Sequence, residues 1–118
     1  MKPFITTAEA GDIAVTAAEG GVTYWAHIAP GDDPYDWSRW MDDDGDTFPD
    51  LPPDFLFYRL TDTVGEKHDV TLRGLKRGYR RLIASGYNLW EPDEPGAMDS
   101  GEADLVVQYA VFGKVVYG

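Results

Sequence analysis

The chain has 118 residues, 43% of them hydrophobic, and a formal net charge of −11. This length and composition suit one domain with a hydrophobic core and argue against disorder throughout. The absence of cysteine excludes disulfides and thiolate metal sites. A pI near 4.3 disfavours nonspecific nucleic-acid binding. Neither a signal peptide nor the roughly 18 apolar residues of a membrane span is visible, so we expect a cytoplasmic protein.

The first predicted element is a helix over residues 7–19. Thr6 and Glu9 have the spacing of a capping box. Gly20 follows directly, and glycine is the commonest residue just after the end of a helix. Gly11 lies inside this helix, where glycine is about 1 kcal/mol less favourable than alanine. A strand over residues 12–17 therefore remains an alternative.

A β-branched and aromatic run over residues 22–28 predicts a strand, and a long acidic loop over about residues 30–53 follows it. A connection of this length in a compact domain is either functional or mobile. Its aromatic residues are unusual for a solvated linker, so we expect some of the rings to pack on the body of the protein. These residues are Tyr35, Trp37, Trp40 and Phe48.

Residues 55–60 and 67–70 predict two strands that form a hairpin. Thr71 is the expected cap of a helix over residues 72–85, which Gly86 ends. The apolar residues of this helix recur at helical spacing and form one stripe. They are Leu72, Leu75, Tyr79, Leu82 and Ile83.

A second acidic loop is expected over residues 87–98, and a buried, nearly all-apolar helix over residues 103–112 follows it. Three valines keep a strand open as an alternative there. Residues 114–117 predict a closing strand. The chain is therefore predicted to be a single α+β domain over residues 1–118. It would have a small antiparallel sheet of three to four strands and about three helices packed on it.

Three stretches carry a resemblance: EGGVTYWA at residues 19–26, VTLRGL at residues 70–75 and ADLVVQYAVFGKVVYG at residues 103–118. Together they resemble small, largely uncharacterised proteins encoded by tailed phages of actinobacteria. The likeness covers most of the chain outside the two acidic loops. It implies an intracellular accessory protein made during infection, and it brings no assigned activity and no catalytic residues.

Half of the ten basic residues lie within residues 73–81, on the side of the predicted helix opposite its apolar stripe. Arginine presents a rigid fork that matches phosphate or carboxylate, so this face is a candidate anion site. The alternative is a solvated face that balances the chain's own acidic loops, with little energy in each exposed pair. The residues are Arg73, Lys76, Arg77, Arg80 and Arg81.

Two glycines on the same helix, Gly74 and Gly78, suggest the close approach of another backbone, from within the fold or from a second subunit. With the open edge of the expected closing strand, they predict a homo-oligomer, most simply a dimer. Trp37 and Trp40 are open to two interpretations, because rings in a loop can contact a ligand or partner, or can belong to the core. Tyr24 and Trp25 are expected in the core.

The sequence favours no metal, cofactor or catalytic centre. An EF-hand loop beginning at Asp42 would need glycine where Thr47 stands and glutamate where Pro53 stands. His27 and His68 lack partners at zinc-site spacing. No serine has an evident base beside it.

We therefore expect a non-enzymatic phage accessory protein that binds a host protein through the acidic loop, with Trp37 and Trp40 as anchors. One alternative is a binder of a small anionic ligand, for instance a sponge for a nucleotide signal of host defence. Arg73, Arg77, Arg80 and Arg81 would bind its phosphates, and Trp37 or Trp40 would stack on its base. A further alternative is a DNA mimic in which the acids of residues 42–54 imitate phosphates.

Overall fold

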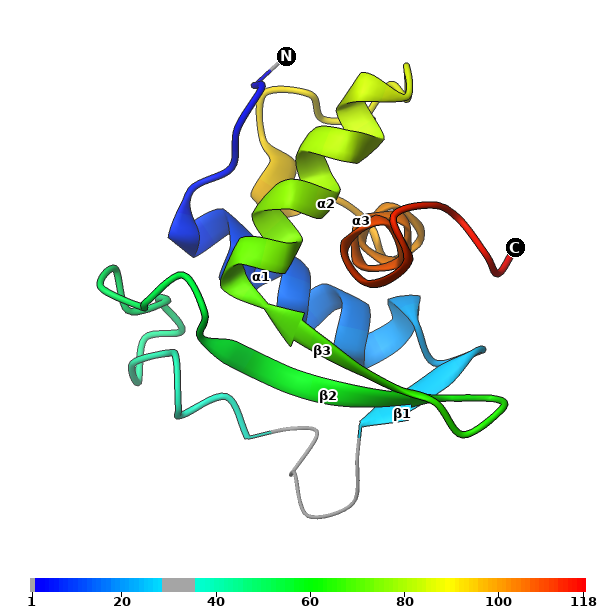
Figure 1. Ribbon diagram of the computed structural model, residues 1–118. Coiled ribbons are helices and arrows are strands. Elements are labelled where there is room, and N and C mark those ends of the chain that lie inside the picture. The colour runs from blue at the N-terminus through cyan, green and yellow to red at the C-terminus, as the bar shows by residue number, and fades with distance from the viewer. Residues whose placement is uncertain (1, 29–35) are drawn as a thin grey trace.

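A three-stranded antiparallel sheet carries the helices on one of its faces (Figure 1). This computed structural model describes residues 2–28 and 36–118. The strands are β1 (Ala26–Ile28), β2 (Leu56–Asp62) and β3 (Lys67–Thr71), in the spatial order β1-β2-β3. The helices are α1 (Thr7–Thr16), α2 (Leu72–Ala84) and α3 (Ser100–Phe112). The predicted α+β class is confirmed.

Helix α1 begins at the predicted capping box. The amide of Glu9 donates to Thr6 Oγ1 at 3.1 Å, and the amide of Thr6 donates to Glu9 Oε1 at 2.9 Å. The α-helical hydrogen bonding ends at Thr16, and the chain continues as a π-helical turn, η1 (Ala17–Gly21). The strand alternative for residues 12–17 is therefore wrong.

Strand β1 is shorter than the predicted strand over residues 22–28. The amides of Trp25 and Ala26 both donate to the carbonyl of Val22, so this part of the chain is a turn that continues from η1. The turn directs the Trp25 ring into the core, where only 1% of the residue is exposed. Tyr24, also expected in the core, is instead 54% exposed.

The hairpin of β2 and β3 leads directly into α2. Thr71 is both the last residue of β3 and the cap of the helix, because its Oγ1 accepts the amide of Gly74 at 3.0 Å. Gly86 follows the helix in the left-handed region, with φ of 92°. The apolar stripe faces the core as predicted, and Leu72, Leu75, Tyr79 and Leu82 are buried.

Helices α2 and α3 pack closely because Gly78 has no side chain. A Cβ atom there would lie 2.8 Å from the amide nitrogen of Ala110 and closer still to the carbonyl oxygen of Val106. Both atoms belong to α3. The close approach expected at Gly78 is therefore an approach within one chain.

The expected closing strand at residues 114–117 is wrong. Backbone groups of this segment form hydrogen bonds with the buried side chain of Gln108 on α3 instead. Gln108 Oε1 accepts the amides of Val116 and Tyr117, each at 2.8 Å, and Nε2 donates to the carbonyl of Tyr117 at 3.0 Å. The Tyr117 ring also stacks on Trp25 with centroids 5.0 Å apart. Because these backbone groups already form hydrogen bonds to α3, they are not available to pair with a strand of the sheet.

Some aromatic rings of the long loop between β1 and β2 pack against the core, as expected: Trp40 is buried there, and Trp37 is half-buried. Trp40 is 1% exposed and packs edge-on against Phe57 at 5.1 Å. Residues 30–35, including Tyr35, lie outside the described part of the chain. The loop at residues 87–98 contains a short 3-10 helix, η2 (Pro95–Ala97). Within the described residues, every helix is too short or too polar to cross a membrane.

Candidate functional site

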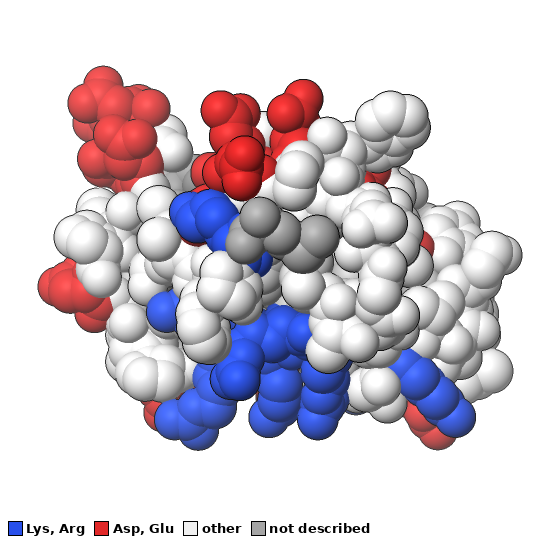
Figure 2. All heavy atoms as spheres, turned by 90° about the horizontal axis from the view of Figure 1, so that it is seen from above, with Lys and Arg blue, Asp and Glu red and all other residues white. Residues whose placement is uncertain are grey.

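Four basic side chains of α2 line a groove of about 520 Å³ on the surface of the molecule. Its lining residues are Phe4, Thr7, Leu51, Pro53, Leu72, Arg73, Lys76, Arg77 and Arg80. Seen from the end of the molecule where α2 lies, lysine and arginine side chains gather in one patch, and acidic side chains gather along the opposite rim (Figure 2). The groove therefore combines an apolar floor with a positive wall.

The spacing of the basic residues explains why they share one wall. Arg73, Lys76, Arg77 and Arg80 stand at i, i+3, i+4 and i+7, which is one face of a helix. The apolar stripe of α2 is held in the core, so this face must point outward. The helix thus presents its cations as a fixed row.

Most of the apolar floor comes from two segments that are distant from α2 in sequence. Backbone bonds fix the loop before β2: the amide of Arg73 donates to the carbonyl of Pro53 at 2.8 Å, and the amide of Leu72 donates to the carbonyl of Phe55 at 3.0 Å. The N-terminal segment is held by a hydrogen bond from the Tyr79 hydroxyl to the carbonyl of Lys2. These bonds place Leu51, Pro53 and Phe4 beside α2.

Within the described residues, none of the four groove cations forms an ion pair. The pairs that the structure shows lie elsewhere: Lys2 with Glu9, Arg59 with Asp69, and His68 with Asp62. Lys76 only approaches the hydroxyl of Thr7 at 3.4 Å. Arg80 lies over the Phe4 ring, 5.0 Å from its centroid. Like charges in a row repel one another, so the groove would gain stability from an anion.

Arg81 does not belong to the groove. Its guanidinium reaches the other way, and Nη1 donates to the carbonyl of Tyr109 in the last turn of α3 at 3.4 Å. A cation at a helix C-terminus interacts favourably with the helix dipole. Arg81 also borders a shallower hollow of about 320 Å³ with Arg77, Arg80 and Ala84. Of the five basic residues proposed as ligand-binding, four share the groove.

The structure places Trp37 and Trp40 away from the groove. Trp40 is buried in the core and has no face left for a ligand, so its assignment as a binding residue is wrong. Trp37 is half-buried and packs on Trp40, with ring centroids 5.1 Å apart. The aromatic residue that does accompany the basic row is Phe4, which is 60% exposed.

Sequence reasoning missed the apolar half of the groove. Phe4, Leu51 and Pro53 are brought to α2 by tertiary contacts that no local pattern encodes. A weak signal existed at Phe4, a large aromatic residue outside every predicted element. Leu51 and Pro53 gave none, because they sit in a proline-rich loop.

The acidic run at residues 42–46 forms a tight, ordered turn. The amides of Asp44 and Asp46 donate to Asp42 Oδ1 at 2.9 and 3.0 Å, and Met41 pairs with Thr47 across the turn. One carboxylate thus caps its own loop. The acids of this turn are exposed.

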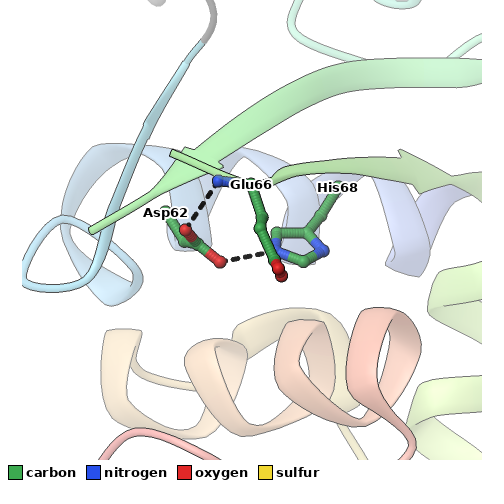
Figure 3. A group of neighbouring side chains, drawn as sticks. All are labelled: Asp62, Glu66 and His68. Atoms are coloured by element: carbon green, nitrogen blue, oxygen red, sulfur yellow. Dashed lines mark hydrogen bonds and ion pairs between the residues drawn. The ribbon is translucent and has the colours of Figure 1, made fainter. Parts of the chain in front are cut away.

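One group of described residues has donor atoms placed for a metal ion: Asp62, Glu66 and His68 (Figure 3). Their ligand atoms all lie within 4.8 Å of one another. His68 has no partner at zinc-site spacing along the sequence, but the hairpin brings Asp62 and Glu66 to it in space. His27 is exposed on β1 and belongs to no such group among the described residues.

No family model, curated protein or solved structure matches this chain.

Proposed function

We propose that this chain is a non-enzymatic binding protein, and that the groove on α2 receives an acidic segment of a partner protein. The observation that carries this proposal is the row of four groove cations without an ion-pair partner in the described residues. The groove lining is basic or apolar apart from the Thr7 hydroxyl, which suits the binding of an anion more than the transfer of a proton.

The apolar floor adds a second requirement for the partner. Phe4, Leu51 and Leu72 offer contact area that a purely acidic segment would leave unused. A segment that alternates acidic and large apolar residues satisfies both the wall and the floor. In such a contact the buried apolar anchor supplies most of the affinity, and the charges supply rate and specificity.

The acidic loop is a weaker candidate for the main binding surface. Its proposed anchor Trp40 is used by the core, and Asp42 caps its own turn. The phage origin, the host identity of the partner, the cytoplasmic location and homo-oligomerisation remain predictions. The two features that suggested a dimer are used within the chain, at Gly78 and at Gln108.

Fluorescence anisotropy with a labelled peptide of Glu, Asp, Leu and Phe tests this proposal. We expect saturable binding that weakens as salt is added. The variant Arg77→Glu should weaken it about tenfold or more, because like charges at an interface cost several kcal/mol. Lys67→Glu changes the net charge equally at an exposed site on β3, so it should bind nearly as the native chain does. Equal losses in both variants would show that only overall charge matters, and would contradict the proposal.

A second candidate is a small anionic ligand, which one observation favours. A groove of about 520 Å³ lies within the range of ligand sites, and Phe4 places a ring beside the cations. Thermal shift assays with mono-, di- and cyclic nucleotides test it. A ligand at 100 times its Kd stabilises by about 2.7 kcal/mol. A stabilisation that disappears in Phe4→Ala would favour this candidate over a protein segment, and no shift with any nucleotide would remove it.

A further inference from the structure

The end of the β2–β3 hairpin brings two carboxylates and an imidazole onto one face of the sheet. Glu66 directly precedes β3, and His68 is the second residue of that strand. The backbone amide of Asp62 donates to the carbonyl of Glu66 at 2.8 Å, which sets Asp62 opposite Glu66. Figure 3 shows the three side chains turned toward one another.

Asp62 is fixed in place before any ligand arrives. Its Oδ1 accepts the amides of Val64 and Glu66, each at 3.0 Å, and this leaves Oδ2 directed at His68 Nε2, 2.8 Å away. The Asp62 side chain is only 2% exposed and that of His68 only 13%. Phe112 packs against the imidazole with centroids 4.7 Å apart and restrains its rotation. Such outer contacts are what hold metal ligands in position.

The backbone bond sets the carboxylates of Asp62 and Glu66 opposite each other, and a cation would relieve the repulsion between these like charges. Glu66 is exposed and free to swing its carboxylate toward Asp62 and His68. Asp62 also lines a surface hollow of about 310 Å³ beside β1. The all-carboxylate turn at residues 42–46 differs, because it offers no nitrogen donor and no buried ligand.

We propose that Asp62, Glu66 and His68 form a binding site for a first-row divalent cation such as zinc. Zinc binds imidazole nitrogen and carboxylate oxygen at about 2.0–2.2 Å, so two ligands of one tetrahedral ion are about 3.3–3.6 Å apart. The donors here are within 4.8 Å, and a small rotation of Glu66 closes the difference. Asp62 Oδ2 and His68 Nε2 must separate slightly to admit the ion. One imidazole and two carboxylates favour zinc or nickel over magnesium.

Isothermal titration of the untagged chain with zinc chloride tests this site. We expect one saturable equivalent. Glu66→Gln should raise the Kd at least about tenfold, since loss of an outer partner alone costs 10–100-fold. Because Glu66 is exposed and its backbone bond to Asp62 is kept, this variant should fold normally. Glu19→Gln removes an exposed acid elsewhere and should bind zinc as the native chain does.

The two histidines provide an independent pair of variants. His68→Gln should abolish the saturable equivalent, and His27→Gln should leave it intact. If His68→Gln fails to fold by far-UV circular dichroism, Glu66→Gln decides the question alone. The proposal is overturned if the native chain shows no saturable binding, if Glu66→Gln binds as tightly as the native chain, or if His27→Gln loses the equivalent.

Discussion

Replacing Gly78 with alanine is expected to destabilise the protein, although alanine is the better helix former. The new Cβ would lie 2.8 Å from the amide nitrogen of Ala110 and still nearer the carbonyl oxygen of Val106. Both are backbone atoms and cannot rotate away. Helices α2 and α3 would therefore have to move apart by roughly half an ångström or more to restore normal contact.

The magnitude follows from two opposing effects. Overpacking costs about 1–3 kcal/mol, and a clash with two backbone atoms belongs in the upper part of that range, at about 2–3 kcal/mol. Replacing glycine by alanine inside a helix returns about 1 kcal/mol. The net loss should be about 1–2 kcal/mol. At about 2.1 cal/mol/K of unfolding entropy per residue, a chain of 118 residues loses about 4 °C in Tm per kcal/mol. The expected decrease is therefore about 4–8 °C.

Differential scanning calorimetry of the variant and of a matched control checks this value. Gly101 lies in the first turn of α3, and a Cβ there meets only Asp99 Oδ1 at an ordinary 3.5 Å. Gly101→Ala should therefore raise Tm by about 2–4 °C, because it restricts the unfolded chain without a clash. A Gly78→Ala protein as stable as the native chain would refute the helix packing described here.

Light scattering on the native chain tests the predicted dimer. A mass near 13 kDa, that of one chain, would contradict it.

Two further predictions concern the polar cluster between the C-terminal segment and α3. Partial desolvation of its hydroxyl and the hydrogen bond to Asp104 raise the pKa of Tyr24 to about 12, whereas an unfolded tyrosine titrates near 10. The stability that this raised pKa contributes is complete below pH 10 and is lost as the pH rises toward 12. The Tm of Tyr24→Phe should therefore fall less between pH 10 and pH 12 than the Tm of the native chain. An equal fall in both proteins would contradict this prediction. Gln108→Ala removes the acceptor for the amides of Val116 and Tyr117, and hydrogen exchange should show these amides protected only in the native chain.

The helices were predictable because their signals are local. Thr6 and Thr71 stand where caps are needed, and the stripe from Leu72 to Leu82 has helical period, so the elements follow from neighbouring residues alone. The hairpin was predictable for the same reason. The boundaries of β1 were not, because the turn at Trp25 depends on a hydrogen bond from its indole to Asp104, 79 residues away.

The closing segment and the site show where local reasoning stops. Residues 114–117 have the composition of a strand, but Gln108 uses their backbone groups from inside α3. Helical spacing predicted the row of basic residues, and tertiary contacts alone brought Phe4 and Leu51 to it. His68 acquired its partners through strand pairing, which spacing along the sequence does not reveal.

The most direct test of the binding groove is an NMR titration of the isotopically labelled chain with the acidic, Leu- and Phe-containing peptide. We predict that backbone amide signals of residues 73–80, Phe4 and Leu51 shift together and saturate with one Kd, while those of residues 42–46 stay in place. Shifts confined to residues 42–46, or no saturable shift at the groove, would contradict the account.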